Sequence, residues 1–132
     1  MDKDISNLIE KLSRKTGFVL VATADRGGFP HLSVAQDLTL SGDHALIEGW
    51  YCPEMLSNLQ KNRSVSLIVW NCATDEGYQI RATVTDIEEN QILDGYEAAV
   101  SEQETPQVRW SLKAQVGLIT LFHSRPHLDS EL

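Results

Sequence analysis

The stretch that most constrains the fold of this chain covers residues 49–82, with the sequence GWYCPEMLSNLQKNRSVSLIVWNCATDEGYQIRA. It predicts the end of a strand, a Cys-Pro elbow, a short helix, a buried strand, a polar turn and a further strand. The elbow directs the N-terminus of the helix toward a ligand that would lie over the preceding strand. The free N–H groups of such a terminus suit a phosphate. The stretch therefore predicts a sheet with a small helix beside a candidate anion site.

The flanking segments predict an antiparallel sheet with helices at its margins. A helix is expected over about residues 3–15, because apolar residues from Ile5 to Leu12 repeat with helical spacing, and Gly17 would end it. Short glycine-containing turns join neighbouring strands, which favours antiparallel pairing. The expected strands are 18–24, 30–40, 45–50, 64–70, 78–87 and 116–122, and the expected further helices are 53–61 and 90–101. About six strands with marginal helices suggest a small closed or half-open barrel.

The composition is that of one soluble globular domain. A chain of 132 residues can form one core, so we expect a single domain with a barrel at about residues 17–123 and a fraying polar tail at 124–132. The net charge of −8 argues against nucleic acid or an anionic membrane as partner, since both need a basic face. The charged N-terminus lacks the apolar core of a signal peptide, so a cytoplasmic location with free thiols at Cys52 and Cys72 is expected.

Four local patterns, taken in order, resemble the FMN-binding split barrel of the pyridoxamine 5′-phosphate oxidase-like group. They are GFVLVATADRGGFPHLSVA, LIEGWYCPEMLSNLQKNRSVSL, VWNCATDEGYQIRATV and GLITLF. They span about residues 16–122, and their order and spacing carry the resemblance. It implies a mainly β fold, a six-stranded antiparallel split β-barrel that forms a homodimer.

The resemblance also implies two FMN sites at the subunit interface. The flavin would lie against the second and third strands, and its phosphate would meet the elbow and the short helix. Carried over by position, the ring-side residues are Val34, Ala35 and Gln36. The remaining cofactor-binding positions are Glu48, Gly49, Trp50, Tyr51 and Cys52 on the third strand and elbow, Met55, Leu56, Ser57 and Asn58 on the helix, and Gln79 on a later strand.

The elbow departs from the family pattern at two residues. Many flavin-binding relatives place Lys, Arg, Thr or Ser where this chain has Glu54 and Met55. A phosphate dianion needs cationic or hydroxyl donors beyond the free N–H groups of a helix. Glu54 in the first helical turn gains ~0.3–1 kcal/mol from the positive dipole end, so it competes for the potential that a phosphate would use. Candidates to compensate are Ser57, Lys61, Arg63, Arg81 and Lys113.

The leading hypothesis for function is an FMN-binding, flavin-dependent oxidoreductase without true pyridoxamine 5′-phosphate oxidase activity. That activity is expected to need a basic C-terminal segment, whereas this sequence ends HLDSEL. A non-enzymatic FMN electron carrier and a flavin-free dimer acting as a binding or regulatory module remain open, and haem or deazaflavin binding is a weaker option. No catalytic side chain is named. His123 and His127 flank Pro126, which argues against a helical metal site.

Overall fold

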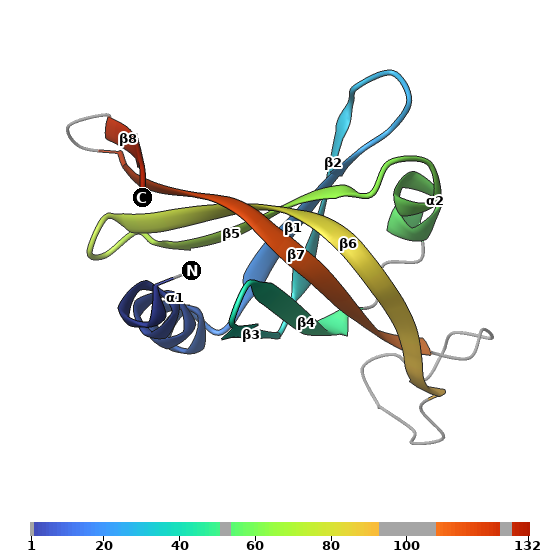
Figure 1. The fold of residues 1–132 in the computed structure, drawn as a ribbon, viewed down its shortest axis with the longest axis horizontal. Helices are drawn as coiled ribbons and strands as arrows, with labels where there is room; N and C mark the ends of the chain where they lie inside the picture. The colour runs from blue at the N-terminus through green and yellow to red at the C-terminus, as the bar shows by residue number, and fades with distance from the viewer. Residues whose placement is uncertain (1, 51–53, 93–107, 125–127) are drawn as a thin grey trace.

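The computed structural model describes residues 2–50, 54–92, 108–124 and 128–132 (Figure 1). Within these residues the fold is mainly β, with two helices and eight strands. In chain order the elements are α1 (Lys3–Thr16), β1 (Val19–Ala24), β2 (Pro30–Ala35), β3 (Asp37–Ser41), β4 (His44–Trp50), α2 (Glu54–Lys61), β5 (Ser64–Asn71), β6 (Glu76–Ile92), β7 (Val108–His123) and β8 (Leu128–Glu131). Neither described helix is long and apolar enough to cross a membrane.

The strands form one antiparallel sheet that curls on itself. Their order is β2-β1-β5-β6-β7-β4-β3, with β8 added beside β7. Strands β2 and β3 stand at the two ends of this order, yet only Gln36 separates them in the chain. The two ends of the sheet must therefore meet, and the Gln36 N–H donates to the Glu48 carbonyl at 3.2 Å where they do. This closure gives the sheet the form of a split barrel.

The expected single strand over residues 30–40 is wrong, because the structure divides it into β2 and β3. Ser33 and Ala35 are buried in β2, whereas Leu38 and Leu40 are buried in β3. The alternation of buried residues therefore slips by one position across Gln36, and at this point the chain changes its pairing partner from β1 to β4. This division is one reason why the described chain has eight strands and not six.

The later part of the chain also differs from the expectation. Residues 90–92 belong to β6 and not to a helix, and the rest of the helix expected over 90–101 lies outside the described residues. Strand β7 begins at Val108, well before the expected start at residue 116. The C-terminal tail contributes β8, which pairs with the end of β7. Long pairing between β6 and β7 outweighs the local helical spacing here.

The core fills the inside of the curled sheet. Its largest fully buried side chains on the strands include Ile47, Leu67 and Ile80. Helix α1 closes one end of the barrel by placing Ile9 and Leu12 against this core, and helix α2 lies at the opposite end, where Met55 and Leu59 join the same core (Figure 1). The expected α1 is confirmed, including its end at Gly17, which caps the helix in the left-handed conformation.

One hydrogen bond ties α1 to the sheet and gives a testable prediction. The half-buried Glu10 carboxylate accepts from the Leu40 N–H at 2.6 Å. Replacing Glu10 with Ala leaves that donor without its partner, so we expect a loss of about 1–3 kcal/mol in the free energy of unfolding measured in urea. Lys11→Ala on the exposed side of α1 is the control, with an expected change within about 0.5 kcal/mol. Equal effects of the two substitutions would contradict this role of Glu10.

Candidate functional site

The outward side of strands β2, β1, β5 and β6 carries a band of apolar side chains, which we call the outer face. Strand pairing places Val34, Leu20, Ile68 and Gln79 in one row across the four strands. A second row contains Leu32, Ala22, Ser66 and Arg81. Leu32 is 60% exposed and Val34 is 53% exposed, and Trp70 is also exposed. The outer face is therefore an open apolar surface, bordered by polar groups on β6.

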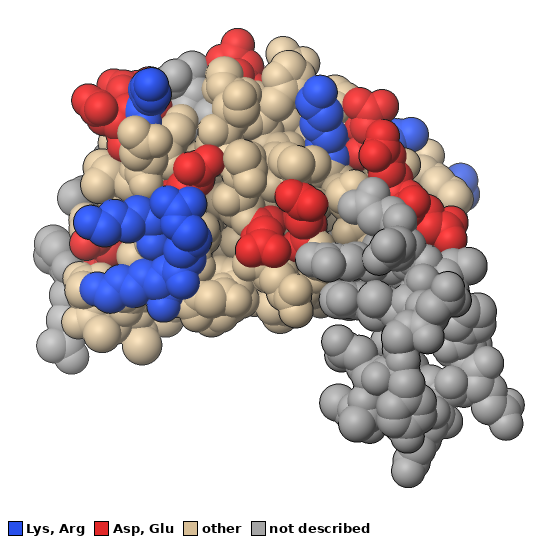
Figure 2. Space-filling model, turned by 90° about the horizontal axis from the view of Figure 1, so that it is seen from below, with Lys and Arg blue, Asp and Glu red and all other residues tan. Residues whose placement is uncertain are grey.

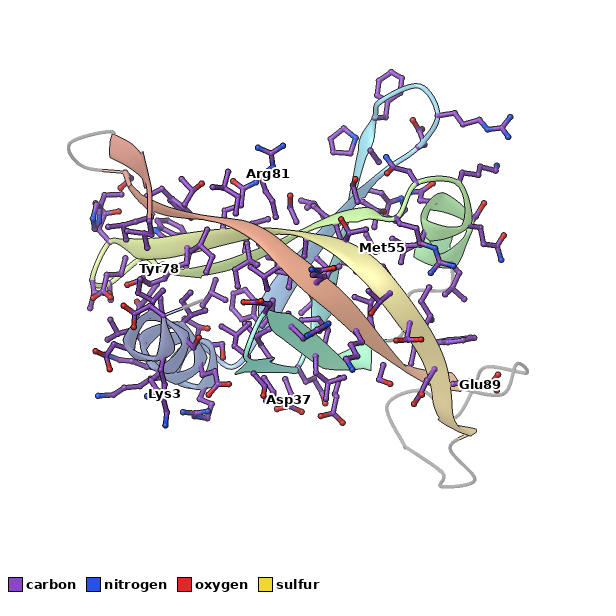
Figure 3. The ribbon with its side chains drawn as sticks, in the orientation of Figure 1. Lys3, Asp37, Met55, Tyr78, Arg81 and Glu89 are labelled. Carbon is purple, nitrogen blue, oxygen red and sulfur yellow. The ribbon has the colours of Figure 1, made fainter. Side chains whose placement is uncertain are left out.

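The outer face contrasts with the other side of the molecule. Arg81 points away from the sheet on the upper side in Figure 3, whereas the buried Tyr78 lies below it. Seen from below, where α1, β3 and β4 lie, the surface carries charged side chains of both signs (Figure 2). The open apolar band and the charged surface are thus on different sides of the sheet.

The structure separates the three predicted ring-side residues. Val34 lies on the outer face, Ala35 points into the core and is fully buried, and Gln36 is exposed at the join between β2 and β3. Gln79 lies on the outer face in the same row as Val34, but three strands away. Val34 and Gln79 are therefore brought to one surface, and Ala35 can offer a ligand only its backbone.

The predicted cofactor-binding positions at the end of β4 lie beside Gln36, where the barrel closes. Gly49 has a positive φ of 72°, and a Cβ atom there would lie 2.9 Å from Gln36 Cβ. The half-buried Glu48 accepts the Gln36 N–H through its carbonyl. The Trp50 backbone pairs with Trp110, while the side chain of Trp50 and all of Tyr51 and Cys52 lie outside what is described.

Gly49→Ala is expected to weaken the barrel closure. The positive φ alone costs about 1 kcal/mol in an L-residue, and forcing a methyl group against Gln36 adds about 1–3 kcal/mol. Gly28→Ala is a matched control, because Gly28 has a φ of 82° and open space around the added Cβ. We expect Gly49→Ala to lower the free energy of unfolding clearly more than Gly28→Ala does. Equal losses in chemical denaturation would show that the close approach to Gln36 carries no cost.

Most of the residues of α2 that were predicted to bind the phosphate point toward the core or toward β1, and not toward solvent. Met55 is fully buried, and the Ser33 hydroxyl donates to its Sδ at 2.7 Å. The Asn58 amide donates to Thr23 Oγ1 at 3.1 Å, which pins α2 to β1. Leu56 packs against the core, whereas Ser57 is exposed.

The outer face suits a flavin ring better than the start of α2 suits a flavin phosphate. The outer face offers apolar packing beside a polar edge, as a flat amphipathic ring requires. Along α2, however, the described side chains offer a single exposed hydroxyl, at Ser57, before the cation Lys61 in the last turn. A phosphate dianion at the start of α2 would therefore lack a described cationic partner there.

Sequence reasoning missed the hydroxyl groups beside Arg81. Ser66 lies directly opposite Arg81 in the β5–β6 register, and Ser64 lies opposite Thr83. The alternation of small polar residues along β5 was the available signal, since Val65, Leu67 and Val69 are the buried partners. Arg81, one of the cations that the sequence offers to compensate for Glu54, points outward and has no ion pair within the described ranges.

The cysteine and histidine candidates offer no metal site in the described part of the chain. There, no group of three or more His, Cys, Asp or Glu side chains could hold an ion. The expected free thiol is confirmed for Cys72, which is exposed. The His123 ring contacts the Asp75 carbonyl, so this imidazole helps to hold the β5–β6 turn against the end of β7.

A curled antiparallel sheet with α1 and α2 at its sides and an open outer face defines a split-barrel protein. A family model described as "Pyridoxamine 5'-phosphate oxidase" matches residues 5–124. The chain belongs to the pyridoxamine 5′-phosphate oxidase family, which confirms the resemblance found in its sequence. No curated protein matches this sequence.

Solved structures share the fold at low sequence identity. A protein from Clostridium acetobutylicum related to general stress protein 26 of B. subtilis has a TM-score of 0.69 and 15% identity, covering 100% of this chain and 97% of that one. HupZ of Group A Streptococcus has a TM-score of 0.62 and 16% identity, covering 94% and 95%. An FMN-binding protein from Syntrophomonas wolfei has a TM-score of 0.61 and 14% identity, covering 92% and 88%. At such identities these likenesses concern the fold alone.

Proposed function

We propose that this chain is a homodimeric flavoprotein that binds FMN at its outer face and acts as a flavin-dependent oxidoreductase. The observation that carries the proposal is the open apolar band around Leu32 and Val34, with Gln79 in the same row as Val34. Bound flavin supplies the redox chemistry, and the residues of this chain position it and exclude water. The proposal does not include true pyridoxamine 5′-phosphate oxidase activity. It does include a cytoplasmic location.

A second copy of the chain is the proposed cover for the outer face. Soluble monomers rarely expose wide contiguous apolar patches, and Leu32, Val34 and Trp70 lie on neighbouring parts of one surface. The family resemblance implies a dimer with the cofactor between subunits, and an open face beside the predicted ring-side residue Val34 agrees with that arrangement. The dimer would enclose a flavin that a monomer leaves exposed to water.

The choice of FMN rests on family membership and on the shape of the surface. A related fold is found in a protein called FMN-binding and in another called an F420 reductase, so flavin-type cofactors occur on this framework. In this chain the exposed apolar groups of β2 can pack against one ring face, and Gln79 can hydrogen-bond to a polar ring edge.

A flavin-free binding or regulatory dimer is the second candidate. The burial of Met55 against Ser33 favours it, because the helix expected to hold the phosphate uses this position for its own packing. A dimer without flavin keeps the outer face as an interface and needs no cation on α2.

Flavin binding and turnover separate these functions. Purified protein should carry flavin absorbance or quench the fluorescence of added FMN, and oxidation of reduced nicotinamide in the presence of an electron acceptor then distinguishes an oxidoreductase from a carrier. Binding without turnover would favour the carrier. A dimer that binds neither FMN nor deazaflavin would favour the flavin-free module.

A further inference from the structure

A cleft of about 590 Å³ hollows the outer face. It runs from Pro30 on β2 across β1 and β5 to Arg81 on β6, and Gly117 and Leu118 of β7 form its far side. Three strand spacings of about 4.8 Å separate β2 from β6, so the cleft is about 14 Å long. Both its length and its volume suit one small molecule with a flat body and an extended substituent.

The charge around the cleft is unusual for this chain. The sequence contains 19 acidic residues and has a net charge of −8, yet none of the residues that line the cleft is Asp or Glu. Arg81 is the one cation among the lining residues, and its guanidinium forms no hydrogen bond or ion pair within the described part of the chain. An exposed guanidinium without a carboxylate beside it is available to an incoming anion.

The polar groups next to Arg81 are arranged as donors. Gln79 Nε2 donates to Ser66 Oγ at 3.3 Å, so the hydroxyl proton of Ser66 remains for a ligand. Ser66 stands directly opposite Arg81, and Ser64 and Thr83 form the neighbouring pair. A cation flanked by hydroxyl donors is suited to an acceptor-rich oxyanion such as a phosphate.

A bulge in β7 shapes the cleft beside Arg81. Arg81 pairs with Leu118 and Ala82 pairs with Val116, so Gly117 is the extra residue on β7. A Cβ atom at Gly117 would reach 3.4 Å from the Arg81 carbonyl oxygen, within the wall of the cleft. Bulges of this kind bend a strand and redirect side chains, often next to ligand sites.

We propose that the Arg81 cleft is a phosphate-binding site, and that it takes a phosphate monoester whose flat apolar body lies toward β2. Arg81 neutralises the phosphate, and Ser66, Ser64 and Thr83 donate hydrogen bonds to its oxygens. The site differs from the start of α2, where the family resemblance implies the phosphate. The identification of the body as the flavin ring rests on the proposed function, whereas the phosphate site rests on the cleft itself.

The test compares FMN, riboflavin and inorganic phosphate on the wild type, Arg81→Gln and Arg63→Gln. Arg63 was also a candidate cation in the sequence, but it is exposed just before β5 and lies outside the cleft lining, so it controls for the loss of one nearby charge. We expect Arg81→Gln to weaken FMN binding about 10- to 100-fold, the effect of losing a charged hydrogen bond, and to leave riboflavin within about twofold. Arg63→Gln should change FMN affinity by no more than about twofold.

Inorganic phosphate tests the cleft without any flavin. In NMR titrations it should shift the backbone amide signals of Ser66 and Thr83 in the wild type and in Arg63→Gln, but not in Arg81→Gln. If these shifts occur while neither flavin binds, the proposed function fails and the phosphate site stands. The phosphate site is overturned if inorganic phosphate leaves these signals unmoved, if the wild type binds FMN and riboflavin equally, or if the two arginine variants weaken FMN alike.

Discussion

Replacing Met55 with Lys is expected to lower the free energy of unfolding by about 3–5 kcal/mol, because it places an unpaired ammonium group in the core. Met55 is fully buried and accepts a hydrogen bond from the Ser33 hydroxyl. A small domain has only about 5–15 kcal/mol of stability, so much of the population would unfold on mild heating. Chemical denaturation monitored by tryptophan fluorescence measures the loss.

Ser57→Lys is the matched control for Met55→Lys. Ser57 is two residues further along α2 and exposed, so a lysine there should change the stability by less than about 0.5 kcal/mol. The same charge on the same helix would then be strongly destabilising on the buried side and nearly neutral on the exposed side. If both variants were equally stable, Met55 would face solvent, and the start of α2 would again be open to a phosphate.

Val34→Asp is expected to convert the proposed dimer into a monomer without unfolding the chain. Val34 is 53% exposed in the single chain, so its replacement costs the monomer little. In a dimer formed through the outer face, the substitution puts an unpaired carboxylate from each subunit into a desolvated apolar interface, at a cost of several kcal/mol for each charge. Size-exclusion chromatography with light scattering reports the change in mass.

Thr39→Asp on β3 provides the control for Val34→Asp. Thr39 is also an exposed strand residue, but it lies on β3 and not on the outer face. It should leave the dimer intact. A wild-type protein that is monomeric at all concentrations, or a Val34→Asp variant that remains dimeric, would contradict the use of the outer face as the interface.

The sequence predicts best where local signals and tertiary contacts agree. Helix α1 combines a helical apolar repeat with a terminal Gly17, and β5 is a short β-branched run between polar turns, so both were found within one or two residues. The elbow stretch likewise gave α2, β5 and the start of β6 in the correct order. These elements, with the four family patterns, were enough to identify the split barrel.

The sequence predicts poorly where pairing over long distances decides. The division at Gln36 depends on a change of strand partner, and residues 90–92 join β6 because β7 offers a long edge for pairing. The orientation of Met55 could not be read from its position in a motif, since one turn of helix places neighbours either in the core or in solvent. Whether the Arg81 guanidinium forms an ion pair depends on which carboxylates the fold brings near it, and the sequence does not give these distances.

The most direct test of flavin binding between two outer faces is a titration of FMN followed by the quenching of its fluorescence, with wild type and Val34→Asp side by side. We predict saturable quenching by the wild type at one FMN per chain, and a loss of affinity of at least about tenfold in the monomeric variant, since removing the partner subunit exposes the ring to water. An absence of quenching by a wild-type dimer would contradict the flavoprotein assignment and favour the flavin-free module.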